Sequence, residues 1–205
     1  MNLPNTLTLT RIFLVPLLIA ALFSTRIPNH EIYATAIFLA AALTDLFDGY
    51  LARRRGQVTT LGVLLDPIAD KLLITAAFIS LVQVEPMWVP AWMVVIIVGR
   101  EFAVSGLRGI AATQGFAIAA NELGKLKTVI QIVAITIIIL GHRYGEVVLG
   151  RVSINLQMAG WIALWLVVIV ALLSAFSYFR KFWQRVDGSV KRQRGPAGLA
   201  NVEPS

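Results

Sequence analysis

Six apolar stretches follow one another along almost the whole chain, and they restrict the possible folds more than any other feature of the sequence. Each is about as long as a helix must be to cross roughly 30 Å of bilayer hydrocarbon, which takes about 20 apolar residues. Short breaks containing polar residues, proline or glycine separate them. The stretches are residues 6–24, 32–53, 60–83, 90–112, 122–141 and 152–179. The sequence therefore predicts an all-α integral membrane protein with six transmembrane helices.

The composition agrees with a protein that lives in a bilayer. Of the 205 residues, 58% are hydrophobic and 14% are charged, whereas an ordinary soluble domain carries roughly 25% charged residues. The formal net charge of +7 therefore indicates contact with anionic headgroups and anionic substrates rather than with nucleic acid. Because the chain has no cysteine and two histidines, any metal site is expected to use oxygen ligands.

The positive charges predict how the chain is oriented. If the N-terminus is cytoplasmic, three of the 18 Lys and Arg residues, Arg26, Arg143 and Arg151, fall on the far side and the other 15 on the cytoplasmic side. The positive-inside rule then places both termini in the cytoplasm. We expect residues 1–185 to form the transmembrane catalytic domain and residues 186–205 a basic, disordered cytoplasmic tail.

Four aspartates stand at helical spacing in the second and third stretches. Asp45 and Asp48 are three residues apart, and Asp66 and Asp70 are four apart, so each pair lies on one helix face. The short break between the stretches makes the two helices antiparallel neighbours, which brings the four carboxylates together near one membrane surface. A charged side chain at the centre of a membrane helix costs about 2.5–3.5 kcal/mol. These carboxylates therefore need compensating positive charge.

Two kinds of partner would supply that charge. Basic side chains in or beside the same stretches would pair with the acids and fix the helix packing; they are Arg53, Arg54, Arg55 and Lys71. Alternatively, a set of oxygen ligands suits hard cations such as Mg²⁺ or Mn²⁺, and two such ions would neutralise all four charges. A two-metal site favours phosphoryl transfer. Intramembrane acids also occur in divalent-cation transporters, but the internal repeat typical of those proteins is not visible here.

The aspartates belong to a longer motif that also fixes small residues and an arginine. It reads Asp45-x2-Asp48-Gly49-x2-Ala52-Arg53-x8-Gly62-x3-Asp66-x3-Asp70, and it resembles the complete signature of the CDP-alcohol phosphotransferase family. The resemblance implies a six-helix membrane enzyme, a homodimer, that moves a phosphoryl group from a CDP-linked donor to a hydroxyl group and releases CMP.

The same resemblance implies a role for each residue of the motif. Two divalent cations, Mg²⁺ or Mn²⁺, would be held by the four acids Asp45, Asp48, Asp66 and Asp70. Asp70 would also be the catalytic base that deprotonates the acceptor hydroxyl. The CDP site would be lined by Asp48, Gly49, Ala52, Arg53 and Gly62.

Four cations of the fourth and fifth stretches bear on the acceptor: Arg100, Arg108, Lys125 and Lys127. An acceptor that carries its own phosphate needs such cations, whereas choline would need acids or an aromatic cage. The pattern therefore predicts a site for the acceptor phosphate. Membrane topology alone would also account for Lys125 and Lys127, and a pair with Glu101 would account for Arg100.

The segments around these residues narrow the resemblance to one bacterial branch of the family, the phosphatidylglycerophosphate synthases. They are Pro4–Arg11, Gly99–Arg108 and Gly124–Gln131. The implied reaction joins CDP-diacylglycerol to sn-glycerol 3-phosphate at the cytoplasmic face of the bacterial inner membrane, giving phosphatidylglycerophosphate and CMP. An inositol phosphate acceptor is the alternative within the family.

Overall fold

The computed structural model describes residues 3–55, 60–113, 122–149 and 152–193. In chain order the elements are α1 (Leu3–Phe23), α2 (His30–Arg55), α3 (Thr60–Val84), α4 (Ala91–Thr113), α5 (Glu122–Tyr144), β1 (Glu146–Leu149), β2 (Val152–Asn155) and α6 (Leu156–Gln193). Each predicted apolar stretch corresponds to one helix, and the first five helices begin and end within a few residues of the predicted limits. The helical class is therefore confirmed.

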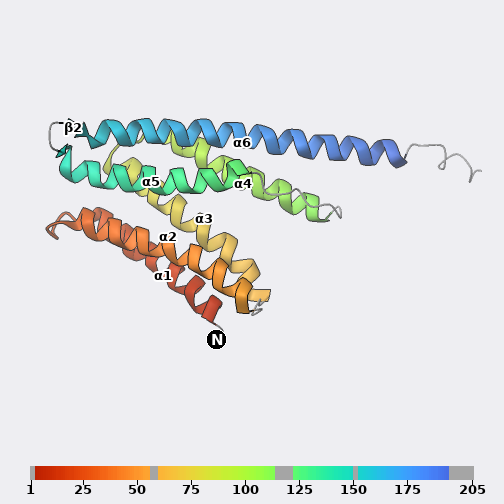
Figure 1. Cartoon of the computed structure of the whole chain (residues 1–205), viewed down its shortest axis with the longest axis horizontal. Coiled ribbons are helices and arrows are strands. Elements are labelled where there is room, and N and C mark those ends of the chain that lie inside the picture. Colours follow the sequence, from red (N-terminus) through yellow and green to blue (C-terminus); the bar gives the residue numbers. More distant parts are fainter. Residues whose placement is uncertain (1–2, 56–59, 114–121, 150–151, 194–205) are drawn as a thin grey trace, which may run out of the picture.

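The helices form two groups with α3 between them (Figure 1). α5 and α6 pack closely and α4 lies against α6, while α1 and α2 form a second pair; α3 contacts α1, α2, α4 and α5. Because successive helices alternate in direction, the end of α2, the start of α3 and the ends of α4 and α6 lie at one end of the bundle. We call this the motif end, because it carries the aspartates, and we call the opposite end, which carries β1 and β2, the hairpin end.

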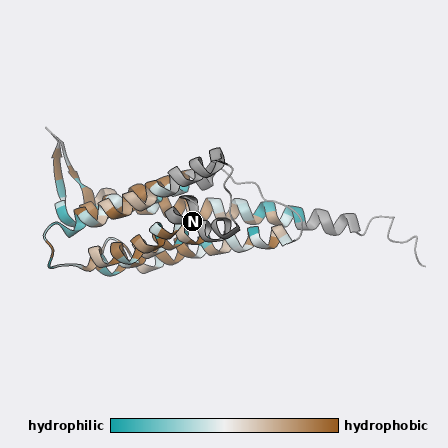
Figure 2. Cartoon of the chain, turned by 90° about the horizontal axis from the view of Figure 1, so that it is seen from below, coloured by the Kyte–Doolittle hydropathy of each residue, from teal (hydrophilic) through white to brown (hydrophobic). Residues whose placement is uncertain are grey.

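Apolar side chains fill the interior and also cover much of the outside. Phe38, Phe78 and Ile135, from α2, α3 and α5, pack in one buried cluster, whereas Phe176 of α6 is 70% exposed. In Figure 2 hydrophobic residues cover most of the described length of the helices. Helices that are apolar both inside and outside the bundle are typical of membrane proteins.

Two helical segments of the described part are long and apolar enough to cross a membrane: Leu126–Tyr144 and Leu156–Arg185. The described apolar parts of three other helices are shorter: Thr8–Phe23, His30–Thr44 and Lys71–Val84. α4 carries three charged residues within its predicted span: Arg100, Glu101 and Arg108. The full set of six spans stays a prediction.

The connection between α5 and α6 differs from the prediction. α5 ends at Tyr144. The next residue, Gly145, has φ 57° and donates its N–H to the C=O of Gly141 at 3.0 Å, a common helix C-terminus. Residues that were expected to begin the sixth helix form β2 instead, and α6 begins at Leu156. The side-chain oxygen of Asn155 caps α6 by accepting the N–H of Met158 at 2.9 Å. α6 then continues to Gln193, into the segment predicted as a tail, and residues 194–205 lie outside the described part.

A glycine allows α5 and α6 to approach closely near the hairpin end. A Cβ atom at Gly160 of α6 would lie 2.8 Å from Cγ1 of Ile138 on α5, nearer than real Cβ atoms come to a neighbour. A larger residue at position 160 would therefore push the two helices apart.

Polar side chains tie three helices together at the hairpin end. Glu85, directly after α3, bonds to Nδ1 of His142 on α5. Next to His142, Nη1 of Arg143 lies 3.6 Å from Oε2 of Glu31 at the start of α2. These contacts fix the ends of α2, α3 and α5 relative to one another.

Candidate active site

The aspartate motif lies where α2 ends and α3 begins. Asp45 and Asp48 fall in the second half of α2, and Asp66 and Asp70 fall in the first half of α3. The two helices contact each other and are separated in sequence only by residues 56–59. The structure thus confirms the helical conformation on which the predicted spacing depends.

The side chains of the motif lie outside the described part of the structure. This holds for the acids Asp45, Asp48, Asp66 and Asp70 and for the predicted CDP site at Gly49, Ala52, Arg53 and Gly62. Their roles stay predictions.

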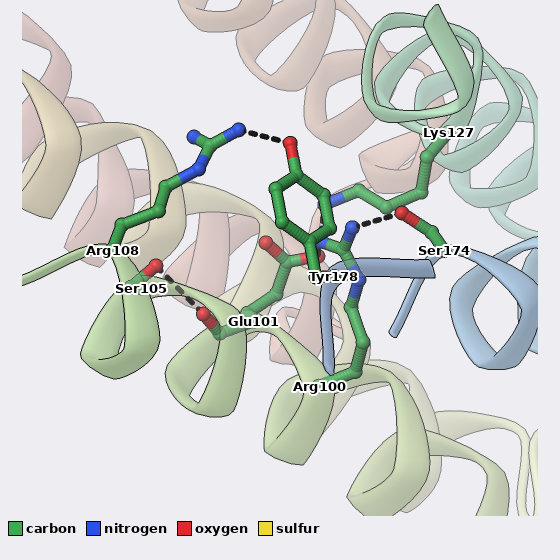
Figure 3. A network of polar contacts seen from close by, with 7 residues as sticks. All are labelled: Arg100, Glu101, Ser105, Arg108, Lys127, Ser174 and Tyr178. Carbon is green, nitrogen blue, oxygen red and sulfur yellow. Dashed lines mark hydrogen bonds and ion pairs between the residues drawn. The ribbon is translucent and has the colours of Figure 1, made fainter. Parts of the chain in front are cut away.

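A network of polar side chains joins α4, α5 and α6 (Figure 3). It consists of Arg100, Glu101, Ser105 and Arg108 on α4, Lys127 on α5, and Ser174 and Tyr178 on α6. Three of the four predicted acceptor cations belong to it, and the side chain of the fourth, Lys125, lies outside the described part.

Arg100 is one of two enclosed residues among the described acceptor cations. It is 8% exposed, donates to the hydroxyl oxygen of Ser174, and places Nη1 3.4 Å from Oε1 of Glu101. Its Nε is buried and has no hydrogen-bond partner among the described residues. The pair with Glu101 that the sequence left open is therefore present, and Arg100 also fastens α4 to α6.

Glu101 holds a second cation. The ammonium group of Lys127, on α5, donates to Oε1 of Glu101, and Lys127 is 6% exposed. One carboxylate thus faces two cations.

A small pocket lies between this network and α3, the helix that carries Asp66 and Asp70. Its walls come from α3, α4 and α5, and its lining residues are Lys71, Ile74, Glu101, Lys127, Thr128 and Gln131. Its volume of about 10 Å³ is enough for about one water molecule. Because Lys71 directly follows Asp70 in α3, the pocket lies next to the motif along the same helix.

Arg108 lies further toward the motif end and is exposed. Its guanidinium group donates to the hydroxyl oxygen of Tyr178 on α6, and Cζ lies 4.9 Å from the centre of the Tyr178 ring. Tyr178 is 1% exposed, so a rigid, buried side chain holds an exposed cation. Cζ of Arg100 also faces this ring, at 5.9 Å.

Ser174 and Tyr178 were not among the residues predicted from the sequence. Both stand on α6, four residues apart, in a helix that is otherwise strongly apolar at that depth. Two polar residues on one face of such a helix are a sign of a polar contact inside the protein. The hydropathy pattern alone did not indicate which cations they contact.

Residues 1–173 match the CDP-alcohol phosphatidyltransferase family, which is most of the chain. The chain belongs to this family. The membership confirms the resemblance that the aspartate motif carries.

Several curated members of the family are similar to the chain over most of its length. The Bacillus subtilis (strain 168) protein named CDP-diacylglycerol--glycerol-3-phosphate 3-phosphatidyltransferase is 40% identical over 199 residues, which cover 92% of this chain and 98% of the relative. A Rickettsia felis protein of the same name is 37% identical over 180 residues, covering 87% and 94%. A rice protein named cardiolipin synthase (CMP-forming) is 35% identical over 202 residues, covering 90% and 58%.

Proposed function

We propose that the protein transfers the phosphatidyl group of CDP-diacylglycerol to the hydroxyl group of sn-glycerol 3-phosphate, giving phosphatidylglycerophosphate and CMP. Family membership and the names of the bacterial relatives support the reaction class. The observation that carries the choice of acceptor is the cationic network of α4 to α6, which reaches the motif helix α3 through the pocket beside Lys71. A phosphorylated acceptor makes use of such cations.

The donor set of the motif fits divalent cations. Four carboxylates on two contacting helices supply only oxygen ligands, which Mg²⁺ and Mn²⁺ prefer, and MgCl₂ or MnCl₂ is therefore a required component of the assay below. Asp45, Asp48, Asp66 and Asp70 would hold two such ions. Bound there, the ions supply charge neutralisation at the diphosphate and polarise the acceptor hydroxyl.

The protein residues then divide the remaining tasks. Gly49, Ala52 and Gly62 leave room for the CDP moiety, and Arg53 offers guanidinium donors to its diphosphate. Asp70 takes the proton of the acceptor hydroxyl while that oxygen bonds to the phosphorus of the phosphatidyl group and the bond to CMP breaks. Arg108, Lys127 and Lys125 bind the acceptor phosphate, and Arg100 positions α4 for this contact through Ser174.

The proposal also includes the membrane arrangement. All six helices would cross the bacterial inner membrane, with both termini and the motif end in the cytoplasm, because 15 of the 18 Lys and Arg residues would then be cytoplasmic. The soluble acceptor would reach the site from that side. Two copies of the chain would form a homodimer, as the motif implies.

The test is CMP release by the purified protein in detergent with CDP-diacylglycerol and Mg²⁺ or Mn²⁺. Glycerol 3-phosphate, inositol phosphate, phosphatidylglycerol, serine and no acceptor are compared in parallel. We expect release with glycerol 3-phosphate alone. Release with inositol phosphate would leave the family assignment intact but change the proposed acceptor. Release with phosphatidylglycerol, which is tested because of the name of the rice relative, would have the same meaning. No release with any acceptor would reopen the transporter hypothesis.

A further inference from the structure

The β1–β2 hairpin has two unlike faces. The strands are antiparallel, and their register pairs Glu146 with Asn155, Val147 with Ile154, and Val148 with Ser153. Residues opposite each other share a face, and successive pairs alternate between the two faces. Val147 and Ile154 therefore share an apolar face, whereas the other face carries one apolar and three polar residues: Val148, Glu146, Ser153 and Asn155.

The protein itself covers only part of this apolar face, and Val147 is half-buried. Ile154 is 43% exposed, and α6 is the helix that contacts both strands. A two-stranded hairpin on its own is at best marginally stable in water, so a surface that covers the Val147–Ile154 face would also stabilise the hairpin.

The position of the hairpin identifies that surface. It joins the two segments that are long and apolar enough to cross a membrane, one ending at Tyr144 and the other beginning at Leu156. The chain therefore leaves and re-enters the bilayer at the two ends of the hairpin, which places β1 and β2 at the membrane boundary. In Figure 2 the hairpin stands across the end of the bundle rather than along the helices. If the helices cross the bilayer, the hairpin lies along the membrane plane.

Neighbouring side chains at the hairpin end are of the kinds found at such a boundary. Tyr144 is 47% exposed, and Cζ of Arg143 lies 5.2 Å from the centre of its ring. Tyrosine and arginine are enriched where helices meet headgroups. The backbone groups at the outer edges of the strands need water or headgroup partners, which the boundary supplies and the hydrocarbon does not.

We propose that the β1–β2 hairpin is a membrane anchor that lies in the headgroup layer at the hairpin end, with the Val147–Ile154 face turned toward the acyl chains. The anchor would hold the α5–α6 connection at a fixed depth. It requires that α5 and α6 cross the bilayer, and it does not depend on the acceptor or on catalysis.

The absence of cysteine from the chain allows a direct test with single spin labels. Val147→Cys and Val148→Cys are a matched pair, because the same residue type is replaced at adjacent positions on opposite faces. Each variant is labelled with a nitroxide and placed in lipid nanodiscs, and power saturation measures its accessibility to oxygen, which concentrates in lipid, and to a water-soluble nickel complex. Leu172→Cys, on the exposed middle of α6, and Arg26→Cys, in the α1–α2 loop, calibrate the lipid and water limits.

We expect the oxygen-to-nickel accessibility ratio at position 147 to be several-fold higher than at position 148 and to approach that of position 172. Ile154→Cys and Ser153→Cys repeat the comparison on β2 and decide the result if a β1 variant does not fold. Equal ratios on the two faces, or ratios equal to that of position 26 on both, would overturn the proposal. Spin–spin broadening at position 147 or 154 that disappears on dilution with unlabelled protein would assign this face to a second copy of the chain and overturn it as well.

Discussion

Replacement of Tyr178 by phenylalanine removes one contact of the proposed acceptor site. The substitution removes the hydroxyl oxygen that accepts the hydrogen bond of Arg108 and keeps the ring that faces the guanidinium group at 4.9 Å. Because Tyr178 is buried and Arg108 is exposed, the core keeps its packing while the arginine loses the partner that orients it.

The size of the effect follows from the kind of hydrogen bond. A hydrogen bond to a charged group contributes about 1.5–3 kcal/mol, and water can replace part of it at an exposed arginine. We therefore take a loss of about 1 kcal/mol, which corresponds to about a fivefold rise in the KM for glycerol 3-phosphate. The KM for CDP-diacylglycerol is expected to stay unchanged, because the lost contact serves the acceptor.

The assay is steady-state CMP release with one substrate varied at saturating concentration of the other. Phe179→Leu is the control, because it alters an exposed aromatic residue one position along α6. If Tyr178 acts through Arg108, then Tyr178→Phe has no further effect on the KM in an Arg108→Ala background. An unchanged KM for glycerol 3-phosphate, or an equal rise for both substrates, would refute the positioning role.

Three further predictions concern charge, packing and chemistry. Glu101→Gln removes the carboxylate that faces two enclosed cations and is expected to lower the free energy of unfolding by about 3–5 kcal/mol, measured as a lower thermal midpoint in detergent. Adding Lys127→Met to this variant should restore part of the lost stability. If the two substitutions instead lower the stability additively, the Glu101–Lys127 pair is contradicted. Gly160→Ala forces a Cβ against Ile138 and should cost about 1–3 kcal/mol in the same melt, so an unchanged midpoint would contradict the close approach of α5 and α6. Asp70→Asn is expected to abolish CMP release while CDP-diacylglycerol binding, followed by calorimetry, is largely retained; normal turnover would remove Asp70 from the mechanism.

Hydropathy predicted the helices well because each of them contains a long run of mostly apolar residues. It failed between α5 and α6, where Val152 and Ile154 continue an apolar run and a strand cannot be distinguished from a helix start by apolarity. The β-branched residues on both sides of Gly150 were the better signal. The same method ended α6 too early, because lysine and arginine lower hydropathy but are good helix formers.

The site was predictable to a different degree. Spacing alone placed the aspartates on two neighbouring helices, since helical periodicity fixes which residues share a face. The contacts of Arg100 and Arg108 with Ser174 and Tyr178 could not be derived in this way, because they depend on how α4 packs against α6, and a sequence separation of 70 residues or more carries no periodic signal.

The most direct test of the central claim is the identity of the lipid product. Purified protein receives CDP-diacylglycerol, Mg²⁺ and an equimolar mixture of glycerol 3-phosphate and inositol phosphate, and mass spectrometry identifies the lipids formed. The proposed function predicts phosphatidylglycerophosphate alone, in amounts equal to the CMP released, and none with the Asp70→Asn variant. An inositol-containing lipid as the main product, or CMP release without a new lipid, would contradict it.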